Sequence, residues 1–457
     1  MSYVHRSEIA QPVADLFAWH ERPGGFARLS PPWLPAQLVH EADSLRNGQA
    51  TVRLPLGLRA VARHVPRGYR PEAQFADRIV VDGIRSLPAA AALPWRHRHE
   101  FEALSAGTSQ MTDRVFTPLG ERLLRPVFRY RHAQLAADLA AHSWRIERGI
   151  PAHTIAISGT SGLVGNALAA FLSTGGHRVI RLARGASTQS DTRMGRRYWD
   201  PSNPDPALLD GVDAVVHLAG ASIFGRFTEQ HRRGIRDSRV SPTRALTELA
   251  ARAHERGNGP HTLITASAIG AYGAQRGDEL LGETSPGGEG FLASVVSEWE
   301  GAAHPAAAAG IRTAHIRTGI VQSAAGGVLG LMRPLFSAGL GGPIGSGEHW
   351  QSWIELNDLV EVYHRALFDP SLTGPVNAVA PHPVRQQEYA QTLARVLRRP
   401  AALRVPAFAP AALLGRDGAA ELALASQRVA PAALESAGHT FRFPTLEPAL
   451  RHQLGRL

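Results

Sequence analysis

The sequence predicts a doubly wound parallel α/β domain from about residue 154 onward, preceded by an α+β domain and followed by a helical segment. Three observations support this fold class. After Thr154, short apolar strands alternate with helical stretches. A glycine-rich turn separates the first of these strands from the first helix. Before residue 149, a group of strand-like segments ends in one long helical stretch, as in α+β domains.

The composition is that of a globular protein with more than one domain. The chain has 457 residues, of which 44% are hydrophobic and 19% charged, so we expect two or three domains with sizeable cores. No apolar run approaches the ~18 residues that span a bilayer, and the N-terminus lacks the apolar segment of a signal peptide. We therefore expect a cytoplasmic protein without a membrane span.

The charged residues and the missing residue types exclude several functions. The net charge is +10, but the basic residues are scattered rather than gathered with aromatics on one face, so we expect no nucleic-acid binding. The absence of cysteine removes disulfides, thiolate catalysis and zinc–thiolate sites, and we expect no metal site. The chain also contains no lysine, and all 49 of its Lys+Arg residues are arginine.

Residues 1–149 are predicted to form the α+β domain. Hydrophobic periodicity marks its elements, and the segment 95–101 alternates polar with aromatic residues without indicating one structure. The expected strands are 3–7, 50–56, 74–82 and 109–116, and the expected helices are 12–19 and 122–148.

Residues 152–375 are predicted to form the parallel-sheet domain, and residues 376–457 an Ala/Leu-rich, mainly helical C-terminal subdomain. The first helix of the sheet domain begins near Leu163 and ends at Gly175-Gly176. The expected strands are 154–158, 179–183, 213–218, 262–267 and 311–317.

A glycine-rich loop follows the first apolar strand of this domain. It reads Gly159-Thr160-Ser161-Gly162-Leu163-Val164-Gly165 and leads directly into a helix. The first glycine permits a tight turn, the second lets backbone amides approach a pyrophosphate, and the third lets helix and strand pack closely. The helix N-terminus adds N–H donors and a partial positive charge. Inside a βαβ unit this loop predicts a dinucleotide-binding Rossmann domain, whereas an isolated glycine triplet would be compatible with an ordinary turn.

The end of the second strand distinguishes the two nicotinamide dinucleotides. A domain that binds NAD usually places an acid there for the ribose hydroxyls, but this chain has Ala183-Arg184. An arginine can pair with the 2′-phosphate of NADP, so we predict NADP(H), with NAD(H) as the weaker alternative. A solvated arginine is the competing interpretation in so arginine-rich a chain.

Two further segments are predicted to contact the cofactor. Leu218-Ala219-Gly220 closes a strand with small residues that would bring the backbone near the dinucleotide. Asp200 follows the next strand-like segment, where it would either touch the adenine or remain a surface carboxylate.

Jointly, these motifs resemble those of extended, atypical short-chain dehydrogenases/reductases (SDR), and the chain is most similar to their NAD-dependent epimerase/dehydratase-like members of uncharacterised substrate. The matching motifs are Gly159–Gly165, His217–Gly220, Ser238-Arg239 with Thr243-Arg244, Ser267–Gly273, Arg317–Gly319, Gly341–Gly347 and Ser352–Asp358. Residues 405–408, 426–429 and 443–446 resemble the C-terminal domain of that group.

The first region resembles a different family, the helix-grip domains of START-like lipid-transfer proteins and polyketide cyclases. The resemblance rests on element order and on the neighbourhoods Phe17–His20 and Tyr130–His132. It implies a hydrophobic ligand held under the long helix. A core filled by the domain's own aromatic side chains is the alternative.

The short-chain resemblance also implies a catalytic Ser/Thr and a Tyr-x-x-x-Lys pair, in which the lysine lowers the pKa of the tyrosine. The corresponding stretch here is Phe291-Leu-Ala-Ser-Val295, and Ala268 falls at the position of the serine. The chain has no lysine to supply, and arginine is too basic to relay a proton. Ser267 and Tyr272 are therefore the nearest candidate catalytic residues and His217 is a weaker one, with a structural role as the alternative for each.

Two functional hypotheses follow. In the first, the protein is an NADP(H)-binding oxidoreductase or epimerase that acts on an unknown small-molecule substrate through a non-standard active site. In the second, it is a catalytically inactive regulatory protein that senses a dinucleotide and binds a ligand. Neither hypothesis fixes the oligomeric state. Asp358 is expected to order the helix that follows it through the helix N-terminus.

Overall fold

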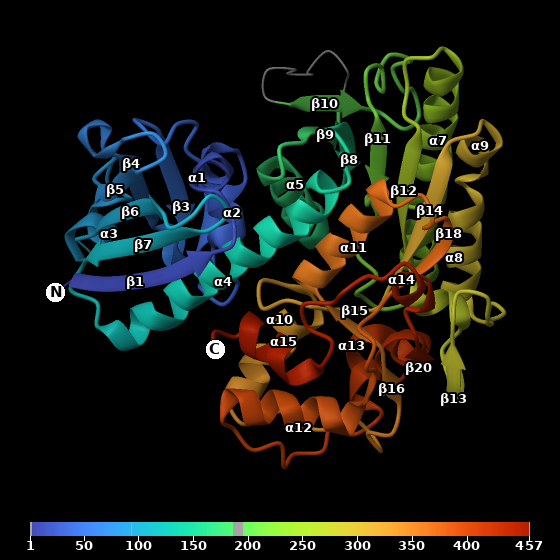
Figure 1. Cartoon of the computed structure of the whole chain (residues 1–457). Coiled ribbons are helices and arrows are strands. Elements are labelled where there is room, and N and C mark those ends of the chain that lie inside the picture. The colour runs from blue at the N-terminus through green and yellow to red at the C-terminus, as the bar shows by residue number, and fades with distance from the viewer. Residues whose placement is uncertain (1, 93, 186–194, 457) are drawn as a thin grey trace. The chain divides into compact units, whose positions relative to one another are not determined.

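The structure is a computed structural model that describes residues 2–92, 94–185 and 195–456 (Figure 1). The chain divides into two compact units. Unit 1 consists of Met1–Pro151 together with Ala170–Gly176 and His452–Leu457, and unit 2 consists of Ala152–Ala169 and His177–Arg451. No helix in the described part of the chain is long and apolar enough to cross a membrane.

Unit 1 is built on a seven-stranded antiparallel sheet in the order β1-β7-β6-β5-β4-β3-β2. The strands β1 and β7, first and last in the sequence, pair along their whole length, from Ser2 opposite Phe116 to Ile9 opposite Ser109. The strands are β1 (Ser2–Ile9), β2 (Gln37–His40), β3 (Gln49–Arg53), β4 (Arg59–His64), β5 (Gln74–Val80), β6 (Arg96–Ala103) and β7 (Ser109–Phe116). The helices are α1 (Val13–Glu21), α2 (Gly25–Leu29), α3 (Leu87–Ala92) and the long α4 (Glu121–Ile146).

The core of unit 1 is apolar and aromatic. The buried side chains come from β1, the short helices, β5–β7 and one face of α4: Ile9, Leu16, Phe17, Trp19, Leu29, Phe75, Phe101, Met111, Leu135 and Leu139. Burial of a large apolar side chain contributes about 1.5–3 kcal/mol, so this cluster holds the helices to the sheet. The predicted α+β domain is confirmed as an antiparallel sheet with a long helix, while its helix-grip identity stays a prediction.

Three strands of unit 1 were not predicted. Most of the segment 95–101, which was left without an assignment, lies in β6, and the other two strands are β2 and β4. In β6 the burial alternates, so that His97, His99 and Phe101 are buried while Arg96 and Arg98 are exposed. A strand whose inward residues are histidines does not show the alternation of apolar and polar residues that marks a half-buried strand.

Unit 2 is a seven-stranded parallel sheet in the order β10-β9-β8-β11-β12-β14-β18. The strands are β8 (Thr154–Ser158), β9 (Arg178–Arg184), β10 (Arg196–Trp199), β11 (Ala214–His217), β12 (Thr262–Ala268), β14 (Arg312–Thr318) and β18 (Gly374–Ala378). All six neighbouring pairs are parallel, which confirms the predicted Rossmann sheet. The five predicted strands correspond to β8, β9, β11, β12 and β14, each within one residue at either end.

Helices connect these strands and form the C-terminal part of the unit. The first of them, α5, spans Leu163–Thr174 and ends before Gly175, as predicted. The others are α6 (Glu229–Asp237), α7 (Val240–Glu255), α8 (Phe291–Gly301), α9 (His304–Ala308), α10 (Gly327–Ser337), α11 (Leu356–Phe368), α12 (Gln386–Leu397), α13 (Ala409–Gly418), α14 (Ala432–Ser436) and α15 (Leu446–Gln453). Short strand pairs complete the unit: β13 (Gln275–Leu281) with β20 (Ser426–Val429), β15 (Ile320–Gln322) with β17 (Trp353–Glu355), and β16 (Trp350–Gln351) with β19 (Val384–Arg385).

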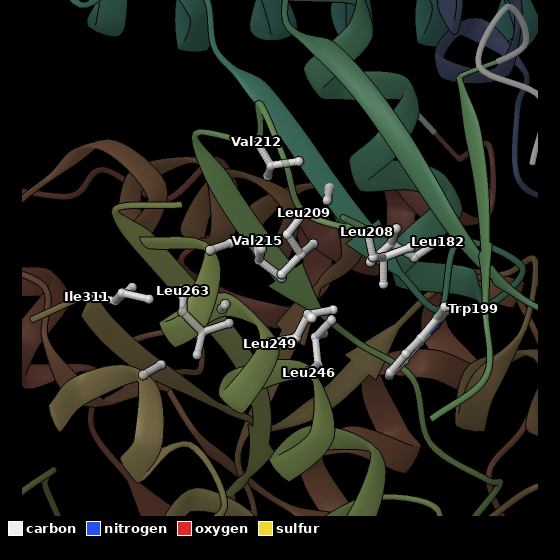
Figure 2. Packing of buried hydrophobic residues seen from close by; sticks show 14 of the residues in the cluster. Leu182, Trp199, Leu208, Leu209, Val212, Val215, Leu246, Leu249, Leu263 and Ile311 are labelled. Atoms are coloured by element: carbon white, nitrogen blue, oxygen red, sulfur yellow. The ribbon is translucent and has the colours of Figure 1, made fainter. Parts of the chain in front are cut away.

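One face of the parallel sheet packs against α7 (Figure 2). Leu246 and Leu249 of the helix join Val215 and Leu263 of the strands, and all four side chains are fully buried. Strands of a sheet that is covered on both faces are buried on both sides and tend to be apolar throughout, which made β8 and β11 the plainest strands in the sequence.

The sheet contains two strands beyond the five that were predicted, β10 at one edge and β18 at the other. The strand β18 crosses the expected limit between residues 375 and 376 and pairs with β14, from Ala314 opposite Gly374 to Thr318 opposite Ala378. Beyond it, four helices and two short strands make the last part of the chain mainly helical. The three-part division at 1–149, 152–375 and 376–457 stays a prediction.

Candidate dinucleotide site

The order of the parallel strands defines where a ligand can bind. The chain passes from β8 to β9 on one side of the sheet and later returns to β11 on the other side of β8. At such a reversal the connections leave in opposite directions and open a crevice at the carboxyl ends of the strands. The glycine loop after β8 lies at this point.

The structure explains why the first and third of the spaced positions in the loop are glycines. Gly159 has a φ of +76°, and a Cβ there would lie 2.8 Å from the carbonyl carbon of Leu218. A Cβ on Gly165 would overlap the carbonyl oxygen of Gly159, so any other residue would push α5 away from the loop. Gly162 closes the turn by donating its N–H to the Gly159 carbonyl at 3.0 Å.

The middle of the loop is accessible. Ser161 and Gly162 are exposed and Thr160 is half-buried, directly before the first turn of α5. Leu163 and Val164, which begin the helix, are half-buried. Backbone N–H groups at a helix N-terminus with no bulky side chain over them form a cradle for an anion.

The end of β11 supplies the second wall of the crevice. The N–H of Leu218 bonds to the Ser158 hydroxyl at 3.2 Å, which ties this strand end to β8. Ala219 is half-buried and Gly220 is exposed, so the backbone here is uncovered. A Cβ on Gly220 would lie 3.2 Å from the guanidinium carbon of Arg239, a residue that the sequence had flagged only as part of a motif.

His217, the last residue of β11, is buried beneath this wall. Its Nδ1 shares a 2.6 Å hydrogen bond with the Ser158 hydroxyl. Burial, with a smaller contribution from the positive charge of Arg184, lowers the pKa of His217 to about 4. The imidazole is therefore neutral near pH 7 and serves as a structural link rather than as a charged ligand for phosphate.

Arg184 and Asp200 follow neighbouring strands. Arg184 is the exposed last residue of β9 and lies opposite Trp199 in the ladder with β10. Asp200 is also exposed, and its carboxylate accepts hydrogen bonds from the Ser202 hydroxyl at 2.6 Å and the Ser202 N–H at 2.9 Å. These bonds lower the pKa of Asp200 and show that it orders a turn.

Ser267 and Tyr272 lie in a buried hydrogen-bond network at the end of β12. The Ser267 hydroxyl donates to Glu300 Oε1 at 2.6 Å. Arg317 binds Glu300 through two N–H groups, at 2.9 and 2.8 Å. A third N–H of Arg317 donates to the Tyr272 hydroxyl at 3.2 Å, and that hydroxyl donates to Asn377 Oδ1 at 2.7 Å.

The charges in this network are mutually stabilised. Burial would raise the pKa of Glu300, but the hydrogen bonds from Arg317 and Ser267 outweigh burial and lower it. Burial raises the pKa of Tyr272, and the Arg317 cation only partly offsets this. Tyr272 has no exposed surface and Ser267 is 4% exposed, so both hydroxyls lie inside the protein.

The two positions that correspond to the usual tyrosine and lysine carry apolar side chains here, Phe291 and Val295. Phe291 is the first residue of α8, and Val295, one turn later, is buried. The carboxylate of Glu421 accepts the Phe291 and Leu292 N–H groups at 3.0 and 2.7 Å, which caps this helix. No titratable group replaces the missing pair at these two positions.

The sequence missed the central member of the network, Glu300. Neither Glu300 nor the role of Arg317 was assigned, although Ser267 and Arg317 lie opposite each other in the ladder of β12 and β14. That adjacency was the available signal, because both residues end predicted parallel strands.

Asp358 lies in the first turn of α11, as expected for an N-terminal acid, but it is not the residue that caps the helix. Glu355 caps α11 by accepting the Asn357 and Asp358 N–H groups. Asp358 instead accepts the N–H groups of Arg442 and Phe443, at 2.6 and 3.1 Å, and so anchors a distant loop. Burial raises the pKa of its carboxyl group well above the ordinary range.

Comparisons with known families match this architecture. The NAD dependent epimerase/dehydratase family matches residues 155–378, and a domain of unknown function, DUF1731, matches residues 405–453. Epimerase family protein Mb2239 of Mycobacterium bovis is 41% identical over 305 residues, which cover 66% of this chain and 98% of that protein.

Two of the similar solved structures show how far the match extends. The crystal structure of the nucleoside-diphosphate sugar epimerase from Corynebacterium glutamicum has 41% identity and a TM-score of 0.85, covering 99% of this chain and 90% of that chain. The human epimerase family protein SDR39U1 (isoform2), solved with NADPH, has 30% identity and a TM-score of 0.60, covering 66% of this chain and 100% of that chain. The first similarity therefore includes the antiparallel sheet, and the second extends over a part about the size of the Rossmann unit.

Proposed function

This chain belongs to the NAD-dependent epimerase/dehydratase family, and on that premise we propose that it is an NADP(H)-dependent oxidoreductase or epimerase that acts without a tyrosine–lysine pair. One observation carries the proposal. The glycine cradle of β8 and α5 is complete, and the end of β9 carries Arg184 where a domain selective for NAD carries an acid.

The cradle fits the pyrophosphate and the 2′-phosphate in chemical terms. The N–H groups around Thr160 and Ser161, at the start of α5, would hold the pyrophosphate. Arg184 would pair with the 2′-phosphate, and Asp200 would lie toward the adenine. The relative from human, solved with NADPH, supports this choice of dinucleotide. When bound, the nicotinamide would supply or accept a hydride.

Ser267 and Tyr272 are the catalytic groups of this proposal. Arg317 places a permanent positive charge 3.2 Å from the Tyr272 hydroxyl and so supplies part of the electrostatic role of the lysine, although burial keeps the pKa of Tyr272 above its ordinary value. Neither Arg317 nor the Asn377 amide that accepts the Tyr272 hydrogen bond takes up a proton near neutral pH, so the proton would have to pass directly between the Tyr272 hydroxyl and the substrate.

A second candidate function is supported by the burial of the same groups. Both hydroxyls already donate to internal acceptors, Glu300 and Asn377. A hydroxyl group that is buried and already donates its hydrogen bond inside the protein is typical of a structural network. In this second candidate the protein binds the dinucleotide and reports its presence without turnover.

The cofactor proposal is tested by isothermal titration calorimetry, in which NADPH or NADH is added to the full chain and to an Arg184→Ser variant. We expect NADPH to bind more tightly than NADH, and the variant to lose about 10- to 100-fold in NADPH affinity, the value of one charge-assisted contact. Arg178→Ser is the matched control, because Arg178 is exposed at the opposite end of the same strand. Tighter binding of NADH, or an unchanged NADPH affinity in Arg184→Ser, would contradict the proposal.

The two candidate functions are separated by turnover. We expect the wild type to oxidise NADPH with one member of a broad carbonyl panel, or to epimerise a sugar nucleotide with the dinucleotide bound. Tyr272→Phe should then lower kcat by about 10²- to 10⁴-fold while the NADPH Kd is unchanged. Tight NADPH binding with no turnover, and no change in Tyr272→Phe except lower stability, would favour the sensing role.

A further inference from the structure

The inner face of the unit 1 sheet carries a cluster of histidine and aspartate side chains that the dinucleotide site does not use. Asp77 lies on β5, His97 and His99 on β6, and Asp113 on β7. In the ladders Asp77 is opposite His97, and Asp113 is opposite His99. Because side chains on a strand alternate between faces, all four lie on the buried face.

These groups are removed from water. His97 is 6% exposed, His99 is 3% exposed and Asp113 has no exposed surface. The side chain of Asp77 is 14% exposed. Two carboxylates in such a place require compensating positive charge, because an isolated buried charge is very costly.

The distances divide the cluster into two sides. On one side, Asp77 Oδ2 lies 3.6 Å from His97 Nδ1 and 3.7 Å from His99 Nε2, too far for hydrogen bonds. One ligand atom from each of these three residues lies within 4.8 Å of the other two. Two ligands on a tetrahedral ion with bonds of about 2.0–2.2 Å are separated by roughly 3.4 Å, so small side-chain rotations would suffice to enclose one.

On the other side, Asp113 faces the remaining ring nitrogens. Its Oδ1 lies 3.1 Å from His97 Nε2 and 2.8 Å from His99 Nδ1. Its Oδ2 accepts a hydrogen bond from His132 Nε2 of α4 at 3.0 Å. A carboxylate behind the ring is the usual arrangement for a metal-bound histidine, because it fixes the orientation of the imidazole.

The hydrogen bonding of the cluster is incomplete. Within the described residues, His97 Nε2, His99 Nδ1 and Asp113 Oδ1 are buried without a hydrogen-bond partner, since their close contacts lie at unfavourable angles. A buried polar group left unpaired costs about 1–3 kcal/mol, and most native structures avoid this cost. These three atoms face one another on the Asp113 side of the rings, at 3.1 and 2.8 Å, so small rotations of the two rings would let Asp113 accept from both of them.

We propose that Asp77, His97 and His99 bind a divalent first-row transition-metal ion, with Asp113 as the positioning residue behind both rings. Two imidazoles and one carboxylate suit ions of the zinc and ferrous type and are poor ligands for Mg²⁺ or Ca²⁺. Three protein ligands leave at least one coordination position open, as in catalytic rather than structural sites. The charge of the ion would balance the two carboxylates.

The experiment uses the full chain without a histidine tag, stripped with EDTA and titrated separately with Zn²⁺, Co²⁺ and Mg²⁺. Bound metal is counted by elemental analysis, and the visible bands of Co²⁺ report its ligands. We expect one Zn²⁺ or Co²⁺ per chain and no stoichiometric Mg²⁺. Asp77→Asn should weaken Zn²⁺ binding by more than about 100-fold, since loss of an outer partner alone costs about 10- to 100-fold.

Two further variants sharpen the assignment. Asp113→Asn should weaken binding by about 10- to 100-fold without changing the stoichiometry. His5→Gln is the matched control, because His5 packs edge-on against His132, with ring centroids 4.6 Å apart, outside the ligand set. Its affinity should equal that of the wild type. Absence of stoichiometric Zn²⁺ or Co²⁺ binding to the wild type, or equal affinities in Asp77→Asn and wild type, overturns the proposal, and near-UV circular dichroism verifies that each variant is folded.

Discussion

The two units of this protein enclose buried charge in different ways. In the parallel unit, Glu300 and Arg317 are joined by two hydrogen bonds, and the neighbouring hydroxyls complete the set. In the antiparallel unit, Asp113 contacts three histidines but forms a hydrogen bond with only one of them, among the contacts described. A network in which every group is satisfied is suited to holding a strand edge rigid, whereas in the antiparallel unit the ring nitrogens that face Asp77 form no hydrogen bond with it and are free to bind a ligand.

Unit 1 also contains a fully satisfied pair, which makes the comparison testable within one unit. Arg28 binds Asp138 through two hydrogen bonds of 2.7 Å, and the two side chains are 4% and 0% exposed. The largest predicted effect is therefore for Asp138→Ala, which leaves the Arg28 cation buried and unpaired. We expect a loss of about 3–5 kcal/mol in the free energy of unfolding, measured by urea denaturation.

Glu121→Ala is the control for that measurement. Glu121 pairs with Arg125 on the same helix as Asp138, but both side chains are about 60% exposed, at 59% and 61%. An exposed pair of this kind contributes little to stability, because both charges stay solvated and are screened. If the two variants lost similar stability, burial would not be what distinguishes the pairs.

The second prediction concerns His217 and the dependence of stability on pH. A histidine in the unfolded chain titrates near 6.5, whereas burial lowers the pKa of His217 to about 4. Between these values the unfolded state binds the proton and the folded state does not, so stability falls as the pH falls from 6.5 toward 4. The full difference corresponds to about 3 kcal/mol.

This contribution is isolated by comparing wild type with His217→Gln in urea unfolding at a series of pH values. The variant should lose stability more slowly below pH 6.5, with a constant offset above it from the lost bond to Ser158. Parallel curves for the two proteins throughout this range would show that His217 does not titrate on unfolding.

The smallest predicted effect is for Glu300→Gln in unit 2. The variant keeps the shape of the side chain and the hydrogen bond from Ser267 but removes the charge that faces Arg317. Because these two side chains are 15% and 13% exposed, rather than fully buried like Asp138, we expect a loss of about 2 kcal/mol. A loss greater than that of Asp138→Ala would reverse the comparison between the units.

The two units also differ in how far their sequence predicted them. Five of the seven strands of the unit 2 sheet were located within a residue, most plainly β8 and β11, which are short runs of buried and mainly apolar residues, whereas β10 and β18 were not predicted. In unit 1, β6 was not assigned because its inward positions are His97 and His99, which look polar in sequence although they are buried. The candidate site was likewise predicted only in part. The spacing of the glycines indicates the phosphate cradle, whereas no motif in the sequence marks Glu300.

The metal hypothesis shows what kind of information was missing. A His-x-His pair places both rings on one face only if the segment is a strand, and Asp77 joins them only through the β5–β6 ladder. The sequence contained all three residues, but their proximity depends on a register that no local pattern specifies. The expectation that the chain has no metal site rested on the absence of cysteine, which excludes thiolate ligands alone.

The composition of unit 1 has a practical consequence for dissecting the protein. A fragment that stops at Pro151 would lack two segments that belong to this unit, Ala170–Gly176 and His452–Leu457. It would remove His452 from beside Tyr130, where the ring centroids are 4.7 Å apart, and Gly455 from its close approach to Trp33. Removal of the last six residues of the chain would therefore alter the amino-terminal unit, although these residues lie at the far end of the sequence.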